Sequence, residues 1–292
     1  MSERGREASA PGREARAPGR EASAPGREAS ALGREASAVS DAGGDASSTG
    51  SLRADGRAPE DLREIRIEPG FVRTATGSAL IEAGGTRVIC TATVEGQVPR
   101  WMAGQGRGWV TAEYGMLPAS TGERKRRDVS KGRPDGRTVE IQRLIGRSLR
   151  GVMDFAALGE RTVWVDCDVL EADGGTRCAA ITGGYVALEL ALRRVADEGG
   201  PETLPLTGSV AAVSCGIVRG RALLDLDYSE DSEAEVDANV VMTGDGGLVE
   251  VQATAERTPL SRASLDELLA LAASGIERLR AAQQDAVATA VG

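Results

Sequence analysis

A glycine-rich turn is the first segment whose residue types are suited to chemistry. Between a predicted strand and a predicted helix, the chain reads Ala172-Asp173-Gly174-Gly175-Thr176-Arg177. Paired glycines allow a ligand to come close to the backbone, and the amides at a helix N-terminus attract an anion. Arg177 can bind a phosphate with two parallel N–H groups, and Thr176 adds a hydroxyl. The turn is therefore a candidate anion site, although Gly-Gly-Thr is also typical of an ordinary turn and helix N-cap.

A nearly identical string occurs earlier in the chain, as Gly84-Gly85-Thr86-Arg87. The flanking segments 78–82 and 87–94 predict a β-hairpin around it. Here the threonine opens a strand, where no helix N-terminus is available to an anion. We therefore expect this copy to be structural.

An acidic run extends from Asp225 to Asp237. Since the chain has no histidine, carboxylates are its natural magnesium ligands and proton donors. Asp231 and Asp237 are six residues apart, near the ends of a turn or short helix predicted between two strands. They can meet at one site, although most acids in such a run are normally solvated.

Basic residues are concentrated between Arg100 and Arg150, where twelve of them face five acids. The densest part is a predicted loop that contains Arg124, Lys125, Arg126 and Arg127. Such a loop is either simply solvated or neutralises the backbone phosphates of a nucleic acid without reading sequence. An arginine-lined anion pocket beside carboxylates that hold a metal is typical of phosphoryl or nucleotidyl transfer.

Composition excludes several other functions. The 292 residues include 44 acids and 35 bases, a net charge of −9, which argues against nonspecific coating of nucleic acid. The absence of histidine excludes Ser-His-Asp triads and histidine metal sites. Four cysteines without a CxxC pair favour a reducing, cytoplasmic location. No apolar run is long enough for a membrane helix, and no apolar stretch marks a secretory signal, so we expect no membrane partner.

The hydrophobic pattern predicts an α+β fold with one domain after residue 51. Two hairpins are expected late in the chain, around Arg219-Gly220 and around residues 244–247, and the last helix is expected to begin with a capping box at 264–267. The other strands are expected at 65–67, 108–116 and 162–170, and the hairpin around 244–247 is expected to begin with a strand at 240–242. Residues 138–153 are expected to form an amphipathic helix with Val139 on its apolar face, and residues 176–195, rich in alanine, leucine and glycine, a buried helix. Trp109 and Tyr114 are predicted to be buried strand aromatics, with base stacking as the alternative.

The first 51 residues differ from the rest. A seven-residue unit of the type GREASAP recurs five times from Gly5, without aromatic residues and with glycine and proline in most units. Such a composition cannot offset the entropy of ordering the chain. We predict a disordered repeat tail over residues 1–51 and a catalytic domain over residues 52–292.

Several longer strings resemble the ribonuclease PH family. They are GQGRGWVTAEYGMLP at 104–118, GRTVEIQRLI at 136–145, DCDVL with ADGGTR at 166–177, and Glu230-Asp231 with Asp237 and NVVM at 239–242. The resemblance extends in order from about residue 53 to residue 286. It implies an α+β fold of the ribonuclease PH type, related to the second domain of ribosomal protein S5, and a homohexameric ring built as a trimer of dimers.

The resemblance also implies an activity. Family members are phosphate-dependent 3′→5′ exoribonucleases that trim the 3′ ends of tRNA precursors. Inorganic phosphate attacks the terminal phosphodiester and releases a nucleoside diphosphate, and the reverse reaction adds nucleotides. The expected partners are therefore tRNA precursors and other RNA 3′ ends, and the chain itself.

Site residues follow from the matched positions. The resemblance implies a phosphate site made by Arg137, Gly175, Thr176 and Arg177. Asp231 and Asp237 match an acidic pair that would hold Mg²⁺ or Mn²⁺ and protonate the departing 3′ oxygen. Arg124 and Arg127 match RNA-binding positions, and Lys125 and Arg126 stand beside them. A position that is basic in some relatives is Ala119 here.

Two rival functions remain open at this point. A noncatalytic RNA-binding ring subunit would be expected to lose the phosphate-site arginines or the acidic pair, and this chain keeps both. A hydrolytic, metal-dependent nuclease needs only the carboxylates and leaves the Gly-Gly-Thr-Arg turn unexplained.

Overall fold

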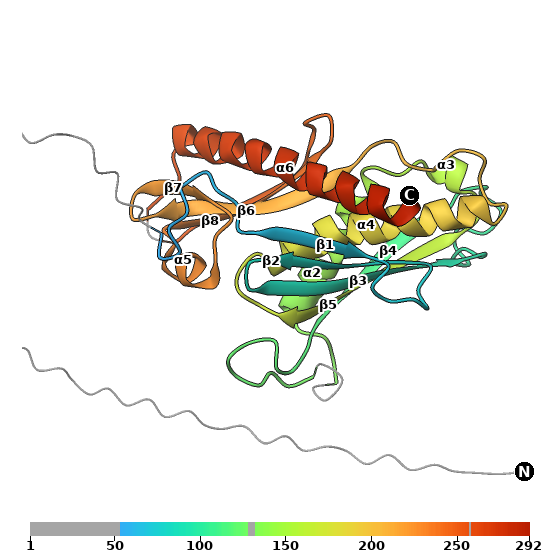
Figure 1. Cartoon of the computed structure of the whole chain (residues 1–292), viewed down its shortest axis with the longest axis horizontal. Helices are drawn as coiled ribbons and strands as arrows, with labels where there is room; N and C mark the ends of the chain where they lie inside the picture. The colour runs from blue at the N-terminus through green and yellow to red at the C-terminus, as the bar shows by residue number, and fades with distance from the viewer. Residues whose placement is uncertain (1–52, 128–131, 257) are drawn as a thin grey trace, which may run out of the picture. The chain divides into compact units, whose positions relative to one another are not determined.

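The computed structural model describes residues 53–127, 132–256 and 258–292. Residues 1–51, which the sequence predicts to be a disordered tail, lie outside this part. Within it the strands form two sheets (Figure 1). The first is built from β1 (Ile65–Pro69), β2 (Gly77–Ala83), β3 (Thr86–Glu95), β4 (Trp109–Met116) and β5 (Thr162–Glu171). The second is built from β6 (Val210–Val218), β7 (Arg221–Leu224), β8 (Val236–Thr243) and β9 (Leu248–Ala255).

The first sheet has the strand order β1-β2-β3-β5-β4. Neighbouring strands are antiparallel except for β4 and β5, which are parallel. Along β5, Val163, Val165, Cys167 and Val169 are buried, and the residues between them are more exposed. This period of two confirms the predicted strand, with its apolar face toward the helices.

The helices are α2 (Gly136–Arg150), α3 (Phe155–Leu158), α4 (Thr176–Asp197), α5 (Tyr228–Glu233) and α6 (Arg262–Val291). α4 packs against β2, β3 and β5 and also contacts β6, whereas α6 covers β6, β7 and β8 (Figure 1). β6 is buried on both faces for this reason. Ala212 belongs to the core beneath α4, and its neighbours Ala211 and Val213 belong to the core beneath α6.

Glycine allows the buried helix α4 to approach the first sheet closely. A Cβ atom at Gly183 would lie 2.7 Å from Ile81 and 3.0 Å from the sulfur of Cys90. Most residues of α4 are buried, which confirms the buried helix expected from its small and apolar residues. The close contact fixes the start of α4, and with it the glycine-rich turn, relative to the sheet.

Three sequence predictions need correction. α6 begins with Ser261 as its N-cap, accepting from the Ser264 N–H at 3.0 Å, so the string at 264–267 lies inside the helix and caps nothing. β8 begins at Val236, before the predicted strand at 240–242. The prediction relied on apolar residues, and the added part of the strand contains the polar residues Asp237 and Asn239. Val139, expected on the apolar face of α2, is 39% exposed.

Candidate active site

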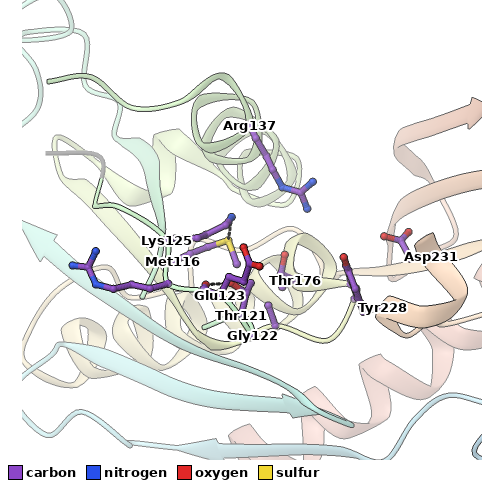
Figure 2. A pocket seen from close by; sticks show the side chains of 13 residues that line it. Met116, Thr121, Gly122, Glu123, Lys125, Arg137, Thr176, Tyr228 and Asp231 are labelled. Carbon is purple, nitrogen blue, oxygen red and sulfur yellow. Dashed lines mark hydrogen bonds between the residues drawn. The ribbon is translucent and has the colours of Figure 1, made fainter. Parts of the chain in front are cut away.

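A cavity of about 710 Å³ lies where the N-terminal ends of α2 and α4 meet α5 and the basic loop. Its described lining consists of Met116, Thr121, Gly122, Glu123, Arg124, Lys125, Arg137, Ala172, Gly174, Gly175, Thr176, Tyr228 and Asp231. Figure 2 shows the side chains of Arg137, Thr176 and Asp231 directed toward one space from three separate elements. The structure therefore brings the predicted anion turn, one carboxylate and part of the basic loop to a single cavity.

The turn itself depends on glycine. Gly174 and Gly175 have φ angles of 77° and 65°, in the left-handed region that favours glycine. A Cβ atom at Gly174 would lie 2.6 Å from the backbone oxygen of Leu226. Gly175 is the N-cap of α4 and has no side chain to accept from the first N–H groups of the helix. These donors are left for a ligand, which agrees with an anion site.

The earlier Gly-Gly-Thr-Arg string, Gly84–Arg87, supports the later one at Gly174–Arg177. Thr86 is fully buried, and its hydroxyl donates to the Gly174 carbonyl at 2.6 Å. The same oxygen accepts from the Asp173 N–H at 2.8 Å. The structural role predicted for the earlier copy is confirmed, and that role is to hold the later copy in place.

Arginines before the first strand neutralise part of the acidic run. Arg63 binds Asp225 with two side-chain nitrogens, at 2.7 and 3.0 Å. Arg53 binds Glu230 in the same manner, with both distances 2.8 Å. Arg63 also donates to the Asp173 carbonyl and so braces the glycine-rich turn. Sequence reasoning missed these arginines, because more than 160 residues separate them from their acids and no local pattern links the two.

Asp231 and Asp237 are the two acids of the run that are candidates for chemistry. Asp231 is exposed on α5 at the cavity wall, and Asp237 is half-buried on the adjacent strand β8. Burial, with the nearby charge of Asp231 and a hydrogen bond to it, raises the pKa of Asp237 to about 6, although Arg177 and Arg137 oppose the shift. The two carboxylates are thus close enough to influence each other's ionisation. A pair of carboxylates that resist joint ionisation can hold a proton or a cation.

Arg137 and Arg177 occupy equivalent places in two helices, since each is the second residue of its helix. Arg137 lines the cavity. Arg177 is not among the lining residues, and its Nη1 donates to Gln252 Oε1 at 2.7 Å and to Glu140 Oε1 at 3.3 Å. Both arginines are close enough to lower the pKa of Asp237. The site therefore combines two cations with two carboxylates.

Thr176 is oriented by a buried tyrosine. Tyr114 is 5% exposed, and its hydroxyl donates to Thr176 Oγ1 at 3.0 Å. Burial raises the pKa of Tyr114, so it stays protonated as a donor. The Thr176 hydroxyl can then donate its own proton to a ligand. The expected burial of Tyr114 is confirmed, and Trp109 is half-buried, with Arg150 4.9 Å from its ring centroid.

The basic loop divides into two parts. Arg124 and Lys125 line the cavity, whereas Arg126 and Arg127 are exposed but are not lining residues. Tyr228, 66% exposed, also lines the cavity, beside Asp231 and Thr176 (Figure 2). Sequence reasoning assigned no role to this tyrosine. The only sequence signal for a role was its position within the acidic run. The hydrophobic pattern of that run does not show whether the tyrosine ring is exposed or buried.

Comparison with known proteins places the chain in a family. A model described as "3′ exoribonuclease family, domain 1" matches residues 61–193, and one for domain 2 of the same family matches residues 208–275. The chain belongs to this family. It is also 57% identical over 232 residues to a protein named ribonuclease PH from Syntrophomonas wolfei, and the match covers 80% of this chain and 97% of that protein. The predicted ribonuclease PH resemblance is thereby confirmed.

Solved structures agree with this 3′ exoribonuclease fold. An Archaeoglobus fulgidus exosome with RNA bound to its active site contains a chain that is 25% identical, with a TM-score of 0.66 over 78% of this chain and 91% of that one. Rrp46 from rice has the same TM-score at 18% identity, covering 80% of this chain and all of that one. The predicted α+β, S5 domain 2-like fold is confirmed. In the described residues, no helix is long and apolar enough to cross a membrane.

Proposed function

We propose that this chain is a phosphate-dependent 3′→5′ exoribonuclease that trims the 3′ ends of tRNA precursors. Inorganic phosphate attacks the terminal phosphodiester, the P–O3′ bond breaks, and a nucleoside diphosphate leaves. The observation that carries the proposal is that one cavity is lined by the N-terminal ends of two helices, each with an arginine as its second residue, and by Asp231, which lies close to Asp237. Phosphorolysis needs both parts, because a dianion must be bound beside a departing 3′ oxygen.

The phosphate is proposed to bind at the start of α4. Gly175 and Thr176 provide backbone and hydroxyl donors there, and Arg137 lines the same cavity, with its side chain directed toward the same space as that of Thr176 (Figure 2). Arg177, the next residue of α4, adds a second cation. Donors that are fixed before the reaction stabilise the charge that develops on the transferred phosphoryl group.

Asp231 and Asp237 are proposed to serve the leaving group. The raised pKa of Asp237 allows this pair to hold a proton near neutral pH, and that proton can pass to the 3′ oxygen as the bond breaks. Microscopic reversibility makes the same pair the base in nucleotide addition.

The same carboxylates fit a divalent cation. Like-charge repulsion contributes to the raised pKa of Asp237, and a bound cation relieves such repulsion. No group of three or more acidic, cysteine or histidine side chains suited to a metal occurs in the described residues. Mg²⁺ suits such a sparse site, because it commonly takes one or two carboxylates and completes its shell with waters and substrate phosphates. Bound there, Mg²⁺ or Mn²⁺ would neutralise phosphate charge.

The basic loop is proposed to hold the RNA behind its 3′ end. Arg124 and Lys125 line the cavity, and the adjacent Arg126 and Arg127 extend the positive surface outward. Such residues neutralise backbone phosphates whatever the base sequence. The exposed ring of Tyr228 can stack on a base, which is equally independent of sequence.

We also propose a homohexameric ring, a trimer of dimers, acting in the cytoplasm. The fold shared with chains of exosome assemblies supports a ring. The four cysteines are unpaired and buried, which is typical of proteins from a reducing compartment.

The proposed reaction is tested by identifying its product. The purified protein is incubated with a 3′-extended tRNA and Mg²⁺, with and without inorganic phosphate. Nucleoside diphosphates that form only with phosphate are the expected result. Monophosphates in both samples would show hydrolysis instead. RNA binding without any release would show a noncatalytic subunit.

A further inference from the structure

A short network of side chains surrounds the Arg177 guanidinium. Its Nη1 donates to Gln252 Oε1 at 2.7 Å and to Glu140 Oε1 at 3.3 Å. Glu140 lies on α2 and Gln252 on β9. Three elements distant in the sequence therefore meet at one nitrogen of the arginine.

The orientation of the Gln252 amide is fixed by its other contacts. Its Nε2 donates to Glu140 Oε1 at 3.1 Å and to Glu250 Oε1 at 3.0 Å. Glu250 is held in turn by Arg147, with both N–O distances 2.5 Å. Because carboxylates take both amide hydrogens, the carbonyl oxygen is the part of Gln252 that faces Arg177.

This arrangement leaves one edge of the guanidinium available. Nη1 makes both hydrogen bonds of the Arg177 side chain, and Nε and Nη2 make none in the part of the chain that the structure describes. The Nε–Nη2 edge is one of the two-pronged edges with which arginine binds phosphate oxygens. Arg177 also lies directly after Gly175 and Thr176, which line the cavity.

Part of the network lies on the same sheet face as Asp237. Gln252 pairs with Asn239 across β8 and β9, and Asp237 lies two residues before Asn239 on the same face of the sheet. One sheet face thus carries both the residue that contacts Arg177 and a carboxylate of the proposed reaction centre.

We infer that Gln252 is a positioning residue for Arg177: with Glu140, it anchors Nη1 so that the Nε–Nη2 edge is presented to inorganic phosphate. The inference rests on the proposed function, which makes Arg177 a phosphate ligand. A free arginine side chain loses considerable rotamer entropy when it binds an anion. Anchoring Nη1 in advance reduces that loss and so strengthens phosphate binding.

The test is Gln252→Met, which keeps the approximate size of the side chain and removes its hydrogen bonds. Initial rates of tRNA shortening are measured with phosphate varied and then with RNA varied. We expect the phosphate KM to rise about tenfold, the effect of losing one hydrogen bond to a charged group. The RNA KM and kcat should change less than twofold. Gln284→Ala is the control, since Gln284 is exposed on α6 and makes no side-chain hydrogen bond among the described residues.

A double-mutant cycle separates positioning from a general structural effect. Arg177→Ala removes every nitrogen that could donate to Gln252, so Gln252→Met should raise the phosphate KM less than twofold when it is added to Arg177→Ala, measured on the residual turnover. An equal effect in both backgrounds would overturn the inference, as would an unchanged phosphate KM in Gln252→Met. Should that variant fail to fold, Gln252→Leu replaces it in the same cycle.

The controls distinguish failure of the inference from failure of the proposed function. If Arg177→Ala raises the phosphate KM and Gln252→Met does not, the phosphate site stands and Gln252 has no positioning role. If Arg177→Ala leaves phosphate dependence unchanged, the proposed site and the inference are both wrong.

Discussion

The two Gly-Gly-Thr-Arg strings show how context gives one sequence two roles. At Gly84–Arg87 the threonine opens strand β3, and Arg87 pairs with Glu82 at 2.8 Å on the sheet surface. At Gly174–Arg177 the threonine opens a helix of 22 residues, and its hydroxyl lies at a cavity. Backbone donors without partners exist at the start of a helix and not within a paired strand, so only the second string can bind an anion through its backbone.

The largest expected difference concerns the two arginines. Arg177→Ala should reduce the turnover of 3′-extended tRNA at least 100-fold, the scale typical for removing one preorganised stabiliser of transition-state charge. Arg87→Ala should stay within twofold of the unmodified protein, because its partner Glu82 belongs to the outer sheet surface. RNA binding, measured by filter retention, should be largely retained in both variants. Similar losses of turnover in the two variants would remove the distinction between the strings.

The basic loop lies beside the second string only. Arg124→Ala combined with Arg127→Ala should weaken RNA binding about tenfold and leave the phosphate KM unchanged. The slope of log affinity against log salt should decrease by about 0.7 for each phosphate of a single strand that the variant no longer neutralises. Arg262→Ala, an exposed arginine at the start of α6, is the control. A change in phosphate KM without a change in salt slope would contradict a role in RNA binding.

The two threonines should affect different quantities. Thr86→Val leaves the Gly174 carbonyl and the Asp173 N–H without their partner, and should lower the free energy of unfolding by about 2 kcal/mol. Thr176→Val should raise the phosphate KM several-fold with a smaller loss of stability. Urea denaturation and phosphate-dependent kinetics measure the two effects. If Thr86→Val left stability unchanged, the earlier string would not support the later one.

The carboxylate pair beside the second string should give a pH-dependent stability. The pKa of Asp237 is raised to about 6, so between about pH 4 and 6 the folded protein keeps a proton that the unfolded chain releases. This contribution to stability is present at low pH and is lost as the pH rises through about 6.

Asp237→Asn removes the free-energy cost of ionising this half-buried carboxylate beside Asp231. In EDTA, the variant should melt a few degrees above the unmodified protein at pH 7.5 and close to it at pH 4.5. Mg²⁺ should raise the melting temperature of the unmodified protein and not that of the variant. Asp285→Asn, on the exposed surface of α6, is the control. An equal difference in melting temperature at both pH values would show that Asp237 does not titrate as described.

Local patterns predicted the elements of the fold well. Alternation identified β5, and small and apolar residues identified the buried helix α4. The predicted start of α6 was wrong. Ser261 and Ser264 can both serve as an N-cap, and Glu267, three residues after Ser264, favoured the incorrect serine. A complete capping box does occur at Asp227 and Glu230, but the sequence does not distinguish these two acids from the other acids of the run.

The site was predictable only in part. The anion turn and the meeting of Asp231 with Asp237 followed from local sequence, but the role of Arg137 came from family resemblance alone. Pairings between distant segments left no trace in the sequence. Arg63 with Asp225 and Arg177 with Gln252 are of this kind, since folding alone brings each pair together.

The most direct test follows the phosphorus atom. ³²P-labelled inorganic phosphate, unlabelled 3′-extended tRNA and Mg²⁺ are incubated with the full chain, and the released nucleotides are separated. We predict label in the β-phosphate of nucleoside diphosphates, formed at similar rates by the unmodified protein and by Arg87→Ala, and at least 100-fold more slowly by Arg177→Ala. Unlabelled monophosphates, or equal labelling by Arg177→Ala, would contradict phosphorolysis at the start of α4.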